Sequence, residues 1–352
     1  MQLVINTAGT ALRVKDGLFQ IAQGDRKQEV APKKVGSIWI TTAVMITTDA
    51  LLLAIENNID VVFLNRFGDP FGRIWHDRPG SITTIRRCQL GLMDSPAGLD
   101  LVKEWIGAKV ENQAKLLETY RKTRARHSPE ITICLDTMRL CIQELLVVQG
   151  IPNEQREKIM NIEGRAARDY FALLAQLIPE RFRFQGRSRN PAGDEFNCLL
   201  NYSYGVLYGK VERACVLAGL DPYIGILHTD NYNKKSLVFD LIENFRIWAD
   251  ETVMGLFAAR QVKETMFDPL KNGFTLNKEG KTVLLGRFMA FLEEPIRFRN
   301  RNIKRQDVIQ LVCHRVANGL LERATGEEEI EIISSEELLS HEGRGTPDVG
   351  GV

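Results

Sequence analysis

The stretch LHTDNYNKKSLVFDLIENFR, residues 227–246, joins an apolar segment to an amphipathic helix. An apolar stripe at helical spacing predicts the buried face of this helix: Leu237, Leu241, Phe245 and Trp248. Asp240 and Glu243 lie three residues apart on the same helix, so we expect both carboxylates to face one spot. Two acids this close repel each other, which predicts that a cation lies between them.

This cation has two interpretations. Salt bridges to neighbouring basic residues would neutralise the acids, with Lys234, Lys235 or Arg246 as the donors. A divalent ion would do the same, and His228, at the end of the apolar segment, would then be a further ligand. Carboxylates with a histidine suit manganese, magnesium or zinc, and oxygen-rich sites favour the harder ions. An ordinary core or surface histidine is the alternative for His228.

Glu163 lies upstream in NIEGRAARDYFALLAQL, on the same side of a predicted helix as an apolar face with two alanines. A carboxylate beside small residues leaves room for a ligand to approach. An acid that favours the first turn of its helix is the simpler interpretation.

The pattern changes along the chain. Residues 1–81 consist of short alternating runs with turn residues between them, plus one helix near 47–58. Apolar residues at helical spacing then predict long helices: 99–126, 129–149, 153–176, 194–218, 237–262 and 306–323. We therefore predict an α+β fold, with a small N-terminal β-sheet domain at 1–81 and a larger all-helical C-terminal domain at 82–325. Residues 326–352 have the composition of a disordered acidic tail.

The composition is that of a globular chain of 352 residues with a net charge of +1. Residues 327–352 carry eight acids and one arginine, a net charge of −7, so the remaining chain carries +8. A basic body suits a polyanion as its partner. No run is long enough to span a membrane, no export signal is visible, and the six cysteines show no CxxC spacing, so we expect a cytoplasmic protein.

Two basic tracts are interleaved with aromatic residues. They are RFRFQGRSR at 181–189, with Arg181, Arg183, Arg187 and Arg189, and RFRNRNIKR at 297–305, which includes Arg297, Arg299 and Arg301. This pattern suits contact with phosphates and stacking on bases, although solvated charge explains it equally well. The segment 99–126 carries seven more basic residues, Lys109 among them, but they are spread around the helix. Arg66 and Arg73 flank a turn in the strand-rich part.

The sequence lacks the motifs of several enzyme classes. There is no GxGxxG after a strand, no GxxxxGK[ST], no HExxH and no GxSxG. Nucleotide hydrolysis and serine or cysteine catalysis therefore have no support.

Three blocks, in this order and spacing, resemble the CRISPR-associated integrase family Cas1. They are EGRAARDYF at 163–171, RSRNPAGDEFNCLLNYSYGVLYGKV at 187–211 and GLDPYIGILHTDNYNKKSLVFDLIENFR at 219–246. VVFLNRFGDPFGRIW at 61–75 is similar to the end of that family's sheet domain, and the resemblance extends over about residues 1–320.

The resemblance implies a role for each matching residue. Glu163, His228 and Glu243 fall on the family's metal ligands, Asp240 on a further acid beside the site, and Arg246 on a basic residue near the scissile phosphate. The block at 187–211, with Asn197 and Tyr204, matches the segment beneath the site. For DNA contact we expect the arginines named above together with Lys234 and Lys235.

The resemblance also implies an activity and partners. We expect a homodimer that uses Mg²⁺ or Mn²⁺ and forms a heterohexamer with the small protein Cas2. It would bind double-stranded DNA with free 3′-OH ends and insert it at a CRISPR leader–repeat by attack on a phosphodiester. A structure-specific nuclease for branched DNA or RNA, and a non-catalytic DNA-binding scaffold, are the alternatives.

Overall fold

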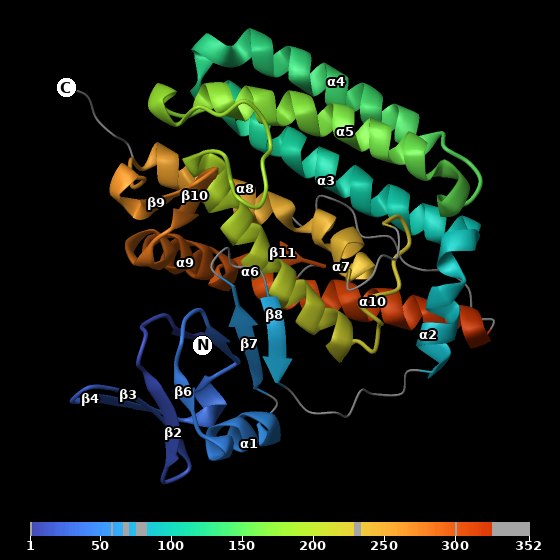
Figure 1. Ribbon diagram of the computed structural model, residues 1–352. Helices are drawn as coiled ribbons and strands as arrows, with labels where there is room; N and C mark the ends of the chain where they lie inside the picture. The colour runs from blue at the N-terminus through green and yellow to red at the C-terminus, as the bar shows by residue number, and fades with distance from the viewer. Residues whose placement is uncertain are drawn as a thin grey trace.

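The computed structural model describes residues 2–57, 59–65, 70–74, 83–228, 234–299 and 301–325. Figure 1 shows a strand-rich N-terminal part followed by a mostly helical part, in which the long helices α3, α4 and α5 lie on the side away from the N-terminal strands. This arrangement confirms the predicted α+β class.

Two four-stranded sheets form the N-terminal part. The first has the order β1-β5-β7-β8 and the second the order β4-β3-β2-β6. Their strands are β1 Gln2–Ile5, β2 Ala11–Lys15, β3 Leu18–Gln23, β4 Arg26–Val30, β5 Ser37–Ile40, β6 Met45–Ile46, β7 Asp60–Leu64 and β8 Pro70–Ile74. In the first sheet β1, β5 and β7 are parallel, with Leu3 opposite Ile38, and β8 is antiparallel to β7. The α-helix α1 spans Thr48–Glu56, close to the helix predicted near 47–58.

The first sheet lies between two hydrophobic cores. Successive residues of a strand point to opposite faces, so β5 contributes to both cores. Ile38 and Ile40 pack with Phe19 in a small N-terminal core, whereas Trp39 and Val62 belong to the large core of the helical part. The sheet and the helices are therefore joined by shared apolar burial.

The helical part contains most of the predicted helices, with ends shifted by a few residues. The structure has α2 Thr83–Leu90, α3 Pro96–Thr123, α4 Ser128–Leu146, α5 Pro152–Leu177, α6 Glu195–Leu217, α7 Ser236–Leu241, α8 Arg246–Ala258, α9 Lys278–Glu293 and α10 Arg305–Thr325. The prediction missed α2 and α9, and it joined α7 to α8, which a 3-10 turn at Ile242–Asn244 separates. None of the helices in the described ranges is long and apolar enough to cross a membrane.

The expectation of an all-helical second part was wrong in one respect, because two short antiparallel hairpins interrupt it. One pairs β9 Phe267–Leu270 with β10 Gly273–Leu276, and the other pairs β11 Pro295–Phe298 with β12 Arg301–Lys304. Strands of four residues carry too little alternation to stand out against the surrounding helical pattern. The predicted domain limit at 81–82 and the tail at 326–352 lie outside the described residues.

Candidate functional site

Asp240, on α7, holds the end of the apolar segment that leads to His228. Its Oδ2 accepts hydrogen bonds from the backbone N–H groups of Ile226 at 2.7 Å and Leu227 at 3.2 Å. Its Oδ1 accepts one from the N–H of His228 at 3.0 Å. A carboxylate that accepts from three backbone donors fixes the path of this segment, and Asp240 is almost fully buried there.

The same carboxylate orients the imidazole of His228, whose Nδ1 lies 2.6 Å from Asp240 Oδ1. Because an ionised carboxylate can only accept, Nδ1 carries the proton in this pairing, and in the neutral imidazole Nε2 is then the acceptor. This carboxylate–histidine pairing is the one that prepares a histidine to bind a metal ion.

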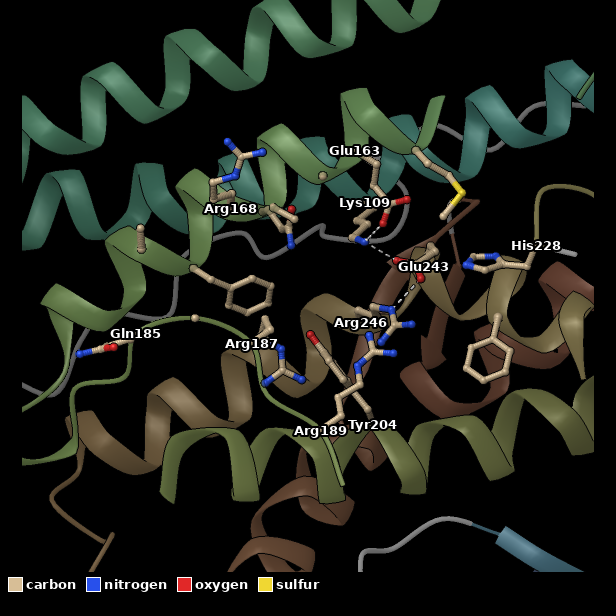
Figure 2. Close-up of a pocket in the computed structure, with 18 of the residues that line it drawn as sticks. Lys109, Glu163, Arg168, Gln185, Arg187, Arg189, Tyr204, His228, Glu243 and Arg246 are labelled. Atoms are coloured by element: carbon tan, nitrogen blue, oxygen red, sulfur yellow. Dashed lines mark hydrogen bonds and ion pairs between the residues drawn. The ribbon is translucent and has the colours of Figure 1, made fainter. Parts of the chain in front are cut away.

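Four charged side chains from separate elements meet next to His228. Glu163 on α5 and Glu243 on the 3-10 turn both contact the Lys109 ammonium from α3, with Lys109 Nζ 2.6 Å from Glu243 Oε2. Arg246, at the start of α8, donates through Nε to Glu243 Oε1 at 2.8 Å. Figure 2 shows these four side chains converging, with His228 close by.

Asp240 and Glu243 do not face one spot, contrary to the prediction from their spacing. Asp240 faces the backbone at 226–228, while Glu243 faces Lys109 and Arg246. The two residues lie on either side of the change from α7 to the 3-10 turn, which breaks the regular helical geometry.

Interactions among these four side chains stabilise their charged forms over their neutral forms. Burial would raise the pKa of Glu243, but the charges of Arg246 and Lys109 outweigh it and hold the pKa at about 2. Burial would likewise lower the pKa of Lys109, and the carboxylates of Glu163 and Glu243 raise it instead. Two negative and two positive charges therefore balance in a largely buried place.

A cavity of about 620 Å³ opens beside this group, and all of its members line it, as does His228. Its other walls include basic and aromatic side chains: Arg168, Arg187, Arg189, Lys234, Phe171, Tyr204 and Phe239. Gly164 and Ala167 lie in the wall beside Glu163, whereas Ala166, the other alanine expected to leave space there, is fully buried. Basic walls suit an anionic substrate.

A polar network supports the cavity from below. Tyr204 and Tyr170 donate their hydroxyls to buried Asp250, at 2.6 and 3.0 Å. Arg187 donates to the side-chain oxygens of Asn197 and Asn201, the latter at 2.7 Å. Burial raises the pKa of Asp250, although the tyrosine hydroxyls oppose this, and burial lowers the pKa of Arg187. The network joins α5, α6 and α8 beneath the charged group.

The structure places the other predicted DNA-contact residues at varied distances from the cavity. Arg187, Arg189 and Lys234 line it. Arg181 lies on the exposed 3-10 turn after α5, near Glu264. Arg183 follows the last residue of that turn and lies near Glu180.

Two further groups of these residues lie away from the cavity. Exposed positions on the hairpin β11–β12 hold Arg297, Arg299 and Arg301. Arg73 and Lys235 both form ion pairs with Glu212 on α6. Arg66 lies outside the described residues.

The types of residue present are those that bind a divalent metal. Their positions in this structure are not those of a bound metal site. Two carboxylates and an imidazole whose Nδ1 is held by Asp240 are a suitable donor set. Within the described ranges, however, no three His, Cys, Asp or Glu side chains are grouped closely enough to hold an ion. Lys109 occupies the space where Glu163 and Glu243 meet.

Lys109 is a central site residue that the sequence prediction missed. It lies in the buried stripe of α3 with Trp105, Ile106 and Asn112, and its own exposure is only 8%. A lysine inside an apolar stripe needs a buried partner of opposite charge, and this was the signal in the sequence.

Solved structures place the chain in a fold class. The Cas1 protein of Thermotoga maritima has a TM-score of 0.76 with 22% identity, over 91% of this chain and 97% of that chain. A casposase bound to integration product has a TM-score of 0.79 with 22% identity, over 95% of this chain and 96% of that chain. The fold is therefore that of Cas1 proteins and this casposase.

Sequence comparison then defines the family. The family model described as CRISPR associated protein Cas1 matches residues 3–290. The chain is 33% identical to the CRISPR-associated endonuclease Cas1 1 of Archaeoglobus fulgidus over 324 residues, which cover 88% of this chain and 94% of that protein. The chain belongs to the Cas1 family, and the resemblance stated from the three sequence blocks is confirmed.

Proposed function

We propose that this chain is a metal-dependent DNA endonuclease and integrase that inserts short DNA fragments into a CRISPR array. The observation that carries the proposal is the basic cavity into which Glu163, Glu243 and the oriented His228 all face. The family name of its relatives and the casposase of similar fold, which is bound to integration product, support it.

The proposed ligands of the ion are Glu163, His228 and Glu243, with Asp240 orienting the histidine. Mg²⁺ or Mn²⁺, when bound, would favour the ionised form of the attacking 3′-hydroxyl and neutralise charge on the phosphate.

The chain's own residues would bind and orient the phosphodiester. Among the described residues the Arg246 guanidinium makes its hydrogen bond through Nε, which leaves its other nitrogens to face the cavity that it lines. These donors suit the non-bridging oxygens of a phosphate. Arg189 and Lys234 add positive charge along the wall, and Tyr204 lies under Arg246, 4.7 Å from the guanidinium carbon to the ring centre.

The proposed partners follow from the same reaction. The substrates are double-stranded DNA with free 3′-OH ends and the CRISPR leader–repeat, which the exposed arginines would hold by backbone contacts. A homodimer joined to Cas2 in a heterohexamer is the proposed assembly. A Cas6-RT-Cas1–Cas2 complex that contains a chain of similar fold supports Cas2 as the partner. Because the substrate includes chromosomal DNA, we place the reaction in the cytoplasm.

A strand-transfer assay with Cas2 tests the proposal. A duplex with free 3′-OH ends should join to a leader–repeat plasmid in the presence of Mg²⁺ or Mn²⁺. Glu163→Ala and His228→Ala should abolish joining, whereas His314→Ala, on an exposed part of α10, should not. Cleavage of branched substrates without any joining would favour a structure-specific nuclease. Wild-type binding to DNA with neither reaction would favour a scaffold.

A further inference from the structure

The ammonium of Lys109 occupies the meeting point of the two proposed carboxylate ligands. It contacts Glu163 and lies 2.6 Å from Glu243 Oε2, while Arg246 Nε holds the other oxygen of Glu243 at 2.8 Å. Lys109 and Arg246 together neutralise the two acids. The carboxylates are thus held side by side by protein cations.

A divalent ion cannot simply be added to this group. It would compete with the ammonium for the same carboxylate oxygens, and two further positive charges would repel Lys109 at short range. A lysine, however, ends in a compact charge on a flexible stem, so it can leave without disturbing the helix that carries it.

A second observation identifies where the ammonium can go. Gln113 lies one helical turn after Lys109 on α3 and lines the same cavity. Its side-chain oxygen is buried and has no hydrogen-bond partner among the described residues. This oxygen and an anionic substrate phosphate in the cavity would both accept the ammonium.

We propose that Lys109 is an internal counter-cation that exchanges with the divalent ion. Without the ion, Lys109 holds Glu163 and Glu243 together. When the ion binds, the ammonium turns toward Gln113 and the DNA phosphate. Because the phosphate gives the displaced charge a partner, DNA and metal strengthen each other's binding. This inference rests on the proposed metal-dependent function and makes Lys109 a positioning residue.

Chemical modification of the wild-type protein tests the exchange directly. Sulfo-NHS-acetate acetylates exposed lysines, and mass spectrometry measures the rate at each position. In the DNA-free protein, Mn²⁺ should raise the acetylation rate of Lys109 at least about tenfold, because a buried side chain reacts only when it becomes accessible. Lys103, on the same helix, is the control and should react at an unchanged rate. Equal protection of Lys109 with and without bound Mn²⁺ would overturn the proposal.

Calorimetric titration with Mn²⁺ gives an independent measurement. Without DNA, Lys109→Met should bind Mn²⁺ roughly tenfold more tightly than the wild type, since the competing charge is gone. Lys103→Met should bind as the wild type does. Adding duplex DNA should tighten Mn²⁺ binding to the wild type more than to Lys109→Met. Weaker binding by Lys109→Met, in a variant that melts cooperatively, would contradict the exchange.

The two proposals fail in different ways. If the wild type binds no Mn²⁺ at all, the proposed metal centre and the proposed exchange are both wrong. If Mn²⁺ binds and Glu163→Ala abolishes that binding, but Lys109 stays protected, the exchange alone is wrong.

Discussion

At the scale of single residues, Asp240 makes more structural contacts than its sequence pattern indicated. Three backbone donors and the Nδ1 of His228 all use its two oxygens, so one side chain fixes both a loop and an imidazole. The orientation of the His228 ring in the cavity wall depends on this arrangement. Loss of the Asp240 carboxylate should therefore lower both the stability of the protein and its affinity for metal.

Asp240→Asn tests this double role. The amide keeps the shape of the side chain but has one accepting oxygen, so buried backbone donors lose their partner and the free energy of unfolding should fall by about 1–3 kcal/mol. Metal affinity should fall by about 10–100-fold, the usual effect of losing a partner behind a metal-bound histidine. Urea unfolding and Mn²⁺ titration measure the two effects, with Asp136→Asn on the exposed face of α4 as the control. Loss of stability with unchanged metal affinity would mean that His228 is not a ligand.

Glu251, on α8, predicts a pH dependence. Burial raises its pKa to about 7, Arg305 opposes this, and Asp250 and Glu294 add to it. A raised carboxyl pKa contributes stability below the ordinary value of 4.5, and this stability is lost as the pH rises through about 7.

Glu251→Gln should remove that dependence. Between pH 5 and pH 8.5 the variant should gain roughly 1–3 kcal/mol relative to the wild type. Urea unfolding across this range measures the difference, and Glu157→Gln on the exposed face of α5 should follow the wild type. A constant difference between Glu251→Gln and the wild type would show that Glu251 does not titrate in this range.

At the scale of elements, the long amphipathic helices were predictable because many apolar positions repeat in each of them. The helices α3 to α6 are of this kind. α9 was missed, although Asn277 caps it and Leu284, Leu285, Phe288 and Leu292 form its buried face, because two glycines dilute the pattern. The break at Ile242–Asn244 could not be predicted, since it arises from contacts of Glu243 and Asn244 with α3 and α8 rather than from local propensity.

The N-terminal end of α3 gives a prediction at this scale. A Cβ added at Gly98 would lie 1.9 Å from the backbone oxygen of Leu92 and 3.2 Å from Cγ2 of Ile226, so α3 must approach both closely. Gly98→Ala should lower the free energy of unfolding by about 2–3 kcal/mol, because backbone has to move. Gly107→Ala on the same helix meets only Leu145, at 3.9 Å, and should gain up to about 1 kcal/mol. Thermal and urea unfolding compare the pair, and equal effects would contradict this account of α3.

At the scale of the whole molecule, the site depends on residues that lie far apart in the sequence. The three family blocks identified Glu163, His228 and Glu243, because these blocks contain them. They could not identify Lys109, whose role exists only once α3 packs against α5 and the 3-10 turn. Similarly, Arg73 looked like a turn residue, but it lies at the junction between the first sheet and α6.

This junction is a chain of ion pairs that runs from the first sheet through α6 to the segment before α7. Arg73 on β8 lies 3.0 Å from Asp60 Oδ1 on β7 and 3.3 Å from Glu212 Oε1 on α6, and it donates to the carbonyl of Gly209 at 3.1 Å. The same oxygen of Glu212 accepts from Lys235, just before α7, at 2.8 Å. The first sheet and the segment that leads into α7 thus share one carboxylate.

Arg73→Met should destabilise the whole molecule, because it leaves two buried carboxylates short of a positive partner. Removal of one member of a buried ion pair costs about 3–5 kcal/mol, and urea unfolding measures this loss. Arg13→Met, on an exposed position of β2, is the control and should change little. Adding Asp60→Asn to Arg73→Met removes one of the stranded charges and should restore part of the lost stability. If the double variant loses as much stability as the sum of the two single variants, Asp60 and Arg73 do not interact, and the effect of Arg73→Met comes from its contacts with α6.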